Sequence, residues 1–244
     1  MLEGLYSAAA GMAAQQERID GIANDLANAS TTGYKHVRIG FRDLLYSAQG
    51  NGAGPTVLAG AGSAAAIVGR GEEQGAMQDT GQPLDVAIEG RGWLQVRRPD
   101  GSLALTRAGN LRLDANGRLT TQDGDVLEPP IAVPKGTTPD QLSIAADGTV
   151  RAAGKAIGRI GLLDVPAPDG LQPLGANLFA TTAASGPASA TTTATLRQGA
   201  LEASNVDVGD EMVQMIDAQR TFEMTSKAIQ MQDQMLEVAN QVKR

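Results

Sequence analysis

Residues 204–244, SNVDVGDEMVQMIDAQRTFEMTSKAIQMQDQMLEVANQVKR, carry two apolar stripes with helical spacing. The first stripe repeats every seven residues, at Met215, Phe222, Ile229 and Leu236. The second advances in steps of four and three, through Met224, Ala228, Met231, Met235, Val238 and Val242. The stripes lie on neighbouring faces, so the apolar surface is wider than a two-stranded coiled coil needs. The sequence therefore predicts a long helix that packs against more than one partner.

The start of this helix is also marked in the sequence. Asn205 or Asp207 can cap its first turn, and Asp210 and Glu211 place negative charge where the helix dipole favours it. Five of the eight methionines lie within residues 212–235, and methionine suits contacts that must adapt. At about 1.5 Å per residue, a helix of roughly 35 residues would be about 52 Å long.

A stripe with the same period occurs at the N-terminal end of the chain. Its residues are Leu5, Met12, Ile19 and Leu26. An intermediate row of Ala8, Ile22 and Ala29 is interrupted only by Gln15. We expect an amphipathic helix of about 26 residues from Leu2 to Asn28, ended by the polar run 28–32 and by Gly33.

The shared heptad spacing at the two ends favours a paired, coiled-coil-like module. Two helices alone bury little surface, so we expect them to be frayed in the free monomer and ordered on assembly. The alternative is that both helices pack only on the body of their own chain. A heptad stripe by itself is compatible with either arrangement.

The middle of the chain alternates short apolar runs with turn signals. Apolar residues alternate within residues 84–88, 94–96, 103–105, 111–113 and 142–144. Asp-Gly or Asn-Gly pairs occur at residues 100–101, 116–117, 123–124, 147–148 and 169–170. This spacing of short strands and tight turns predicts an antiparallel β domain.

We therefore predict an α+β fold in which an antiparallel β domain is inserted between long N- and C-terminal helices. The expected parts are a terminal helical module at 1–33 plus 205–244, an extended arm and Gly/Ala-rich loop at 34–83, the β domain at 84–180, and a linker at 181–204. Within the arm, residues 47–75 are expected to form a long loop.

Composition narrows the classes of function. The net charge of −7 argues against nucleic-acid binding, which needs a basic face. The absence of cysteine excludes disulfides, thiolate metal sites and a cysteine nucleophile. No basic residue precedes Arg18, so no signal peptide is expected. The uncharged stretch 44–69 contains six glycines and Pro55, which argues against membrane insertion.

Candidate ligand-binding and catalytic motifs are weak. His36, the only histidine, is expected at the surface, and no Gly-x-Ser-x-Gly elbow accompanies it. Residues 60–66 half-match a dinucleotide-binding turn but lack its third glycine. Residues 114–125 have the length of a calcium loop, but Arg118 and Leu119 occupy positions that need a ligand and a glycine. Two hairpin turns are predicted there instead.

Asp85 and Glu89 are a generic pair of carboxylates with no pocket implied. The sequence therefore predicts no catalytic residue, no cofactor-binding residue and no metal ligand.

Specific motifs occur at both ends of the chain and in its middle. They are LYSAAAGM at 5–12, IANDLAN at 22–28, TTGYK at 31–35, DVAIEGRG at 85–92, TRAGN at 106–110, LEASNVD at 201–207, EMV at 211–213, AQR at 218–220 and SKAI at 226–229. Together they resemble the signatures of bacterial flagellar rod and hook proteins over nearly the whole chain. The terminal motif residues are Asn24, Leu26, Ala27, Asn28, Thr32, Gly33, Tyr34, Lys35, Ser204, Asn205, Val206 and Asp207.

The C-terminal run is most similar to the distal rod subunits, with the proximal rod subunits as the close alternative. Hook subunits carry an additional domain for which this chain has no room. The chain departs from the family pattern at four positions: Asp25 replaces a usual asparagine, Trp93 and Leu111 replace phenylalanine, and Phe222 stands where tyrosine is common.

The resemblance implies a structural, non-enzymatic subunit that polymerises helically into a hollow shaft and transmits torque from motor to hook. It implies export through the flagellar type III apparatus without a cleaved signal, and assembly in the periplasm. The implied partners are further copies of the chain, other rod and hook subunits, and the export apparatus, with outer ring proteins as a further candidate. No cofactor, nucleic acid or membrane insertion is expected.

The terminal helices are expected to form the inner packing of such a shaft. The expected interface residues are Leu5, Met12, Ile19, Ile22, Leu26, Met212, Met215, Phe222, Met224, Ile229, Met231, Met235 and Leu236. Two other functions compete with this hypothesis. An accessory protein would contact rod or hook without polymerising, and a wall hydrolase on a rod scaffold would need an acid/base pair that the β region lacks.

Overall fold

The structure is a computed structural model that describes residues 2–44, 46–49, 57–60 and 62–242. These residues form long N- and C-terminal helices and many short antiparallel strands, so the fold is α+β as predicted. The chain divides into two compact units. The helical unit comprises Met1–Ala27, Val37–Val68 and Asp207–Arg244, and the β unit comprises Asn28–His36 and Gly69–Val206.

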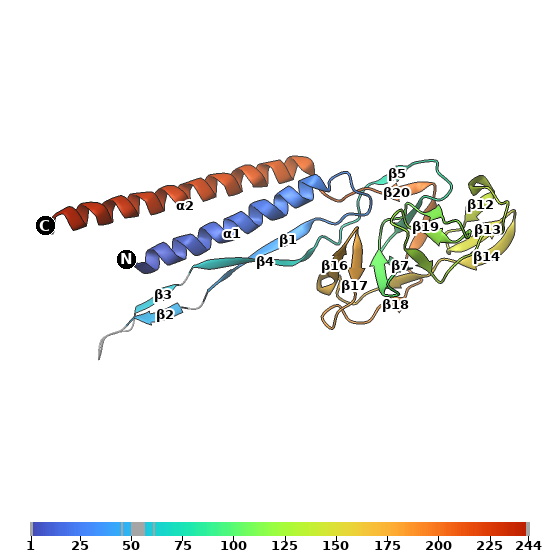
Figure 1. The fold of residues 1–244 in the computed structure, drawn as a ribbon, viewed down its shortest axis with the longest axis horizontal. Coiled ribbons are helices and arrows are strands. Elements are labelled where there is room, and N and C mark those ends of the chain that lie inside the picture. The colour runs from blue at the N-terminus through green and yellow to red at the C-terminus, as the bar shows by residue number, and fades with distance from the viewer. Residues whose placement is uncertain (1, 45, 50–56, 61, 243–244) are drawn as a thin grey trace. The chain divides into compact units, whose positions relative to one another are not determined.

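In the helical unit, α1 (Leu2–Ala27) and α2 (Val208–Val242) lie side by side and run in opposite directions (Figure 1). Both helices have the predicted lengths. Two small sheets accompany them. One pairs β1 (Val37–Asp43) with β4 (Ser63–Arg70), and the other pairs β2 (Tyr46–Gln49) with β3 (Val57–Gly60).

The long loop predicted over residues 47–75 is therefore wrong for the described residues that form β3 and β4. Their small side chains give little sign of a strand, but they allow close packing. A side chain at Gly40 in β1 would collide with Val68 of β4, whose Cγ1 lies 2.5 Å from an ideal Cβ position. β4 is therefore a strand because it pairs with β1, and its own composition does not indicate this.

One face of α1 packs against β1. Ile22 and Ala14 are buried on this helix, and the side chain of Ile39 occupies the space that a side chain at Gly21 would need. The buried Asp25 carboxylate accepts a hydrogen bond from the Val37 backbone N–H, at 3.0 and 3.1 Å from its two oxygens. Asp25 therefore holds the first residue of β1 against α1.

The main sheet of the β unit is antiparallel. Its strand order is β16 (Gln172–Gly175), β17 (Leu178–Ala180), β8 (Leu103–Thr106), β7 (Trp93–Arg97), β11 (Val126–Glu128), β10 (Leu119–Thr120) and β9 (Arg112–Leu113). β15 (Leu162–Asp164) pairs with β7 and with β18 (Ser189–Ala190). The predicted hairpins at residues 114–125 are confirmed, because β10 pairs with both β9 and β11.

Smaller sheets complete the β unit. β12 (Leu142–Ile144), β13 (Thr149–Ala152) and β14 (Lys155–Arg159) form a three-stranded sheet, β19 (Thr195–Gln198) pairs with β6 (Val86–Glu89), and β20 (Ala200–Glu202) pairs with β5 (Met77–Asp79). Single 3₁₀ turns lie at Pro139–Gln141 and Pro168–Gly170. The predicted linker at 181–204 thus contains three strands, whose partners are distant in the sequence.

The core of the β unit is aliphatic. Val86, Ile88, Leu94, Val96 and Leu119 are fully buried in one cluster with other residues of the predicted strands. Burying a side chain of this kind contributes about 1.5–3 kcal/mol to stability. This cluster agrees with the alternating pattern of the sequence and explains how a chain with few aromatic residues builds a core.

Aspartates close several of the predicted turns. Asp147 accepts hydrogen bonds from the backbone N–H and the hydroxyl of Thr149, at 2.9 and 2.8 Å. The bond from the backbone N–H is the larger of these causes that lower the pKa of Asp147, and a hydroxyl bond from Ser102 likewise lowers the pKa of Asp100. Such local bonds specify where one strand ends and the next begins.

Candidate assembly interface

The predicted interface residues of the helical unit fall into an inner group, which is buried or half-buried within the unit, and an exposed group. Those that are buried or half-buried within the unit are Met12, Ile19, Ile22, Leu26, Met215, Phe222 and Ile229. In α2, the less exposed positions step by four and three through 211, 215, 218, 222, 225, 229 and 232, and Ala218 is fully buried. The first predicted stripe therefore faces the interior of the helical unit. The side chains of Leu5 and Leu236 lie outside the described part of the structure.

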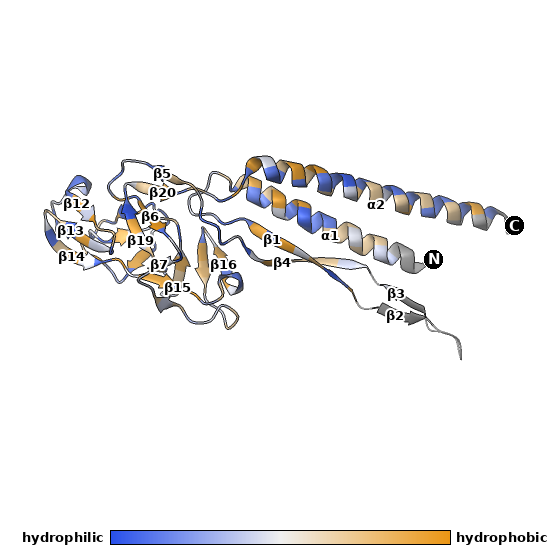
Figure 2. Ribbon diagram, turned by 180° about the vertical axis from the view of Figure 1, so that it is seen from behind, coloured by the Kyte–Doolittle hydropathy of each residue, from blue (hydrophilic) through white to orange (hydrophobic). Residues whose placement is uncertain are grey.

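The second predicted stripe of α2 faces away from this interior, so the prediction that the two stripes lie on neighbouring faces is wrong. Met224, Met231, Met235 and Val238 are 58–67% exposed, and Ala228 between them is also exposed. We call these five residues the exposed stripe. Figure 2 shows hydrophobic residues next to hydrophilic ones along the length of α2. Water-exposed side chains of this size, in a continuous row, are typical of a protein–protein contact.

A second exposed apolar group lies in the first turns of α2. Met212 and Ile216 are 51% and 50% exposed and lie on a different side of the helix from the exposed stripe, whereas Val213, which is 59% exposed, lies on the same side as that stripe. The predicted interface residue Met212 thus belongs to this group. The helix therefore presents apolar side chains in two directions, which agrees with the expectation of more than one partner.

The start of α2 resolves the choice between two candidate caps. The Asp207 carboxylate accepts hydrogen bonds from the backbone N–H groups of Gly209 and Asp210, at 2.8 and 3.2 Å. Asp207 is therefore the N-cap. Asn205 has another role, because its side chain accepts a bond from the His36 N–H and donates to the backbone carbonyls of Gly71 and Glu73.

Residues from three of the sequence motifs, TTGYK at 31–35, TRAGN at 106–110 and LEASNVD at 201–207, meet around one buried carboxylate. Lys35 Nζ lies 2.7 Å from Glu202 Oε1, and Arg107 Nε lies 3.0 Å from Glu202 Oε2. The three side chains, which we call the charge cluster, are 1–6% exposed. Burial is the main cause that lowers the pKa of Lys35, and the hydrogen bond to Glu202 opposes it. Ion pairs this deeply buried need nearly complete hydrogen bonding to persist.

The tight turn before Lys35 explains the glycine of this motif. Gly33 has φ of +67°, and an ideal Cβ there would lie 2.7 Å from the backbone carbon of Arg107. Its N–H donates to the Glu202 carbonyl at 2.8 Å. Gly33 is therefore needed both for its left-handed backbone and for the close approach of two chain segments.

The remaining terminal motif residues have local roles. The Asn28 side chain accepts a bond from the Thr31 hydroxyl, and the Thr32 carbonyl accepts one from the Asn177 amide. Ser204 accepts a bond from the N–H of Val206. In α1, Asn24 and Ala27 are exposed and Leu26 is half-buried.

Three aromatic rings and two arginine guanidinium groups form a connected row of contacts that includes Arg107 of the charge cluster. The Arg70 guanidinium carbon lies 5.6 Å from the Tyr34 ring centre and 5.2 Å from that of Phe179. The Phe179 ring meets Trp93 edge-on at 5.2 Å, and the Arg107 guanidinium lies 5.8 Å from the Trp93 ring. We call these five residues the aromatic ladder. Each such contact contributes about 0.5–2 kcal/mol.

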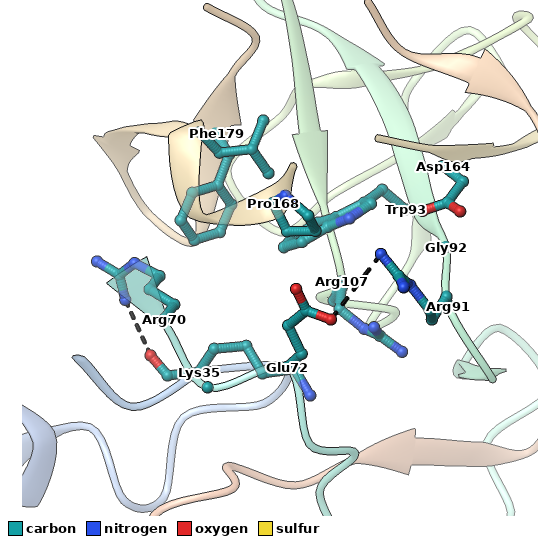
Figure 3. Close-up of a pocket in the computed structure, with 12 residues that line it drawn as sticks. Lys35, Arg70, Glu72, Arg91, Gly92, Trp93, Arg107, Asp164, Pro168 and Phe179 are labelled. Carbon is teal, nitrogen blue, oxygen red and sulfur yellow. Dashed lines mark hydrogen bonds and ion pairs between the residues drawn. The ribbon is translucent and has the colours of Figure 1, made fainter. Parts of the chain in front are cut away.

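Four residues of the aromatic ladder, Arg70, Trp93, Arg107 and Phe179, line a pocket (Figure 3). Arg70 also donates to the Lys35 carbonyl at 2.9 Å, and Arg107 donates to the Gly90 carbonyl at 2.8 Å. Arg91 also lines this pocket and lies 3.8 Å from Glu72 in a long, exposed ion pair. The inner cations are thus already paired within the chain, and the pocket serves as part of the packing between segments.

The other candidate residues have ordinary structural partners. Asp85 accepts a bond from the Thr80 hydroxyl, and Glu89 accepts one from Thr195. His36 is half-buried, and its backbone N–H donates to Asn205. Among the described residues, no group of three His, Asp or Glu side chains is placed to hold a metal ion. None of the helices, over their described residues, is long and apolar enough to cross a membrane.

Sequence reasoning did not foresee the charge cluster or the aromatic ladder. Arg107 and Glu202 lie in quoted motifs, but their charges gave no sign that they meet Lys35 in the interior. The available signal was the isolation of Glu202 in the apolar, small-residue run LEAS, where a carboxylate needs a buried partner or an exposed position.

Three family models match the chain along its length. Residues 5–35 match the flagella basal body rod protein family, residues 87–152 match the D1 domain of the flagellar hook protein FlgE/F/G family, and residues 197–242 match the C-terminal region of the flagellar basal body rod FlgEFG proteins. The first and last matches cover the two terminal motifs, and the middle match covers much of the β unit.

Full-length relatives agree with these matches. The flagellar basal-body rod protein FlgG of Borreliella burgdorferi is 39% identical and covers 100% of both chains. The FlgG proteins of Caulobacter vibrioides and Bacillus subtilis are each 38% identical, over 99% and 100% of this chain and 100% of their own length. The chain therefore belongs to the family of flagellar basal-body rod proteins, as a structural, non-enzymatic subunit of the distal rod, or FlgG, type.

Proposed function

We propose that this rod subunit polymerises helically through its terminal helices into the hollow shaft that transmits torque from motor to hook. The observation that carries the proposal is the exposed stripe of α2, Met224, Ala228, Met231, Met235 and Val238. A soluble monomer gains nothing from a continuous apolar row of this length, whereas a neighbouring copy can bury it. The methionines supply adaptable contacts where neighbours meet at slightly different angles.

Within one subunit, we propose that α1 and α2 pair in a coiled-coil-like manner. The four-and-three spacing of the less exposed residues in α2 supports this pairing.

The predicted interface residues have two roles in this proposal. Leu5, Met12, Ile19, Ile22, Leu26, Met215, Phe222, Ile229 and Leu236 form the pair within each subunit. Met212, Met224, Met231 and Met235 pack between subunits. Dense side-chain packing along both helices resists bending, because protein interiors are close-packed and poorly compressible.

The chain assembles with other rod and hook subunits, as its family does. We further propose that it reaches the periplasm through the flagellar export apparatus and that outer ring proteins are candidate neighbours. The resemblance of the terminal motifs to those of exported rod proteins supports these partners. The terminal helices would line the shaft in this arrangement.

The decisive experiment compares two neighbouring positions on the same helix. Met231→Asp places a charge in the exposed stripe, whereas Gln230→Asp places the same charge on the exposed polar face beside it. We expect Met231→Asp to abolish rod assembly and swimming while the purified monomer keeps the circular dichroism of its parent. Gln230→Asp should assemble and swim normally. Normal swimming of the Met231→Asp strain would contradict the proposal.

A second pair of variants tests the inner stripe. Phe222→Asp or Ile229→Asp should separate α1 from α2 and abolish assembly, while the β unit stays folded. Protease resistance of residues 84–180 in the purified variant would verify that the β unit survives. Swimming by either variant would exclude the proposed helix pair.

A further inference from the structure

Glu202 joins more segments of the β unit than any other residue of the charge cluster. Its Oε1 atom accepts bonds from Lys35 Nζ and from the Gly75 N–H at 3.0 Å, and its Oε2 atom accepts one from Arg107 Nε. Its backbone carbonyl accepts a bond from the Gly33 N–H. A single residue from the C-terminal part of the chain thus satisfies donors from three other segments.

Among the described residues, Glu202 is the carboxylate that pairs with both cations, and their other acceptors are the neutral backbone carbonyls of Glu73 and Gly90. Lys35 and Arg107 are both cations with side chains at most 6% exposed, and each binds one oxygen of Glu202. Without the carboxylate, two like charges would face each other out of reach of water, which is far more costly than an unpaired surface charge. The segment that carries Lys35 could then avoid the penalty only by leaving its position.

Glu202 itself is held by contacts that do not need its charge. It ends β20, whose backbone pairs with β5 through Ala200 opposite Asp79 and Leu201 opposite Gln78. The C-terminal segment can therefore occupy its position first and present the carboxylate to an incoming N-terminal segment. The aromatic ladder would close in the same step, because Tyr34 precedes Lys35 and Arg70 donates to the Lys35 carbonyl.

We propose that the Glu202 carboxylate is a closing switch, and that residues 28–36 dock stably on the β unit only when the C-terminal segment has placed this carboxylate between Lys35 and Arg107. The charge of Glu202, rather than its size, decides whether the N-terminal segment is docked or open. The switch acts within a single chain, so its test does not depend on assembly into a rod.

The test is amide hydrogen exchange, measured by mass spectrometry on the full-length monomer. Glu202→Gln keeps the shape of the side chain and removes its charge. We expect exchange in residues 28–36 and 69–75 to become about 100-fold faster or more, because breaking a buried ion pair is strongly destabilising. Exchange in β13, residues 149–152, should not change, since that strand pairs with β12 and β14, which carry no residue of the charge cluster or the aromatic ladder.

Asp79→Asn is the matched control. Asp79 pairs with Arg197 at 2.8 Å, but both side chains are largely exposed and Asp79 lies in the strand that pairs with β20. Loss of this surface pair should leave exchange in residues 28–36 unchanged. Exchange in Glu202→Gln at the rate of the parent chain, or an equal effect of Asp79→Asn, would overturn the proposal.

A second variant separates charge from packing. In the double variant Lys35→Met with Glu202→Gln, the unpaired cation is gone, and the Glu73 carbonyl that Lys35 bonded still accepts from Asn205. We expect exchange in residues 28–36 to be at least about tenfold slower than in Glu202→Gln alone. Faster exchange in the double variant would show that the cluster acts by packing and would overturn the switch.

The double variant also decides the case in which Glu202→Gln does not fold at all. A folded double variant would then support the switch, because removal of one cation rescues the loss of the anion. An unfolded double variant would overturn it, because shape and hydrogen bonding, rather than charge balance, would then control closure.

Discussion

Lys35 Nζ lies 2.7 Å from Glu202 Oε1, although the two residues are 167 positions apart in the chain. The contact brings the N-terminal family motif and the C-terminal family motif into one buried cluster. Residues on either side of it also meet, since the Asn205 N–H donates to the Tyr34 carbonyl at 3.3 Å and Gly33 donates to Glu202. The segments that precede α2 and follow α1 are therefore anchored together inside the β unit.

The pKa of Lys35 leads to a test at alkaline pH. Burial lowers the pKa below the ordinary value of 10.5, with Arg107 opposing the charge and Glu202 and Glu73 favouring it. Between the lowered pKa and 10.5, the unfolded chain binds more protons at this position than the folded chain does. The contribution of Lys35 to the free energy of unfolding should therefore rise with pH in that window.

Denaturant unfolding of the parent chain and of Lys35→Met, measured across the alkaline range up to pH 10.5, checks this sign. The difference between the parent and variant unfolding free energies should shift in favour of the parent as pH rises. A shift in favour of the variant would mean that Glu202 outweighs burial.

Alanine substitutions at two glycines should distinguish the cost of backbone strain from the cost of steric conflict. Gly33 and Gly81 have nearly equal φ values of +67° and +68°, but only Gly33 has backbone atoms within 3 Å of an ideal Cβ. Gly81→Ala should cost about 1 kcal/mol of unfolding free energy through strain alone. Gly33→Ala should cost clearly more, because the Arg107 backbone must move. Equal losses in urea denaturation would argue against the close approach.

Alanine substitutions at Asp207 and Asn205 should speed amide exchange in different parts of the chain. Asp207→Ala removes the cap of α2 and should cost about 1 kcal/mol of helix stability. In assembled basal bodies, where α2 is expected to be protected, faster amide exchange should be confined to the first turn of that helix. Asn205→Ala should instead speed exchange at His36, whose N–H it binds, and in residues 71–73. If Asn205→Ala frayed the helix start and Asp207→Ala did not, the assignment of the cap would be reversed.

Trp93 is the only tryptophan and reports on the aromatic ladder. Its ring is buried against Phe179, which is 4% exposed. Phe179→Ala should cost about 3–5 kcal/mol and shift the tryptophan emission to longer wavelength as water reaches the ring. Phe41→Ala, at a position 47% exposed in the helical unit, should cost about 0.5 kcal/mol or less and leave the emission unchanged.

Amide exchange on the free monomer tests the expected fraying of the helices. We expect α1 and α2 to exchange quickly in the monomer and to become protected in assembled basal bodies. Residues 33–36 and 202–206 should already be protected in the monomer, because their hydrogen bonds lie within the β unit. Protected helices in a monodisperse monomer would support packing on the chain's own body instead.

Much of the fold followed from periodicity. The heptad spacing of Met215, Phe222 and Ile229 predicted α2 and its inner face, and the alternation at Val86, Ile88 and Leu94 predicted buried strands. These predictions succeeded because the face that a residue presents depends only on local backbone geometry. The exposed stripe was also visible in the sequence, as apolar positions that a single partner could not cover.

Strands made of small residues were missed. β4 and β19 consist largely of Ala, Gly, Thr and polar residues, and each is a strand because a distant segment pairs with it, β1 in one case and β6 in the other. Local propensity is weak for such segments, and the pairing energy comes from residues far along the chain.

The sequence by itself determined the two long helices, the β region between them, the absence of catalytic motifs and the family resemblance, since all of these depend on local spacing and motif identity. Only the tertiary structure decided that Asp207 caps α2 while Asn205 ties three segments together, and that Lys35, Arg107 and Glu202 meet in the interior. Charges distant in sequence attract or repel according to their separation in space, and burial multiplies that effect. The separation of two such charges and their burial are both defined only once the chain has folded.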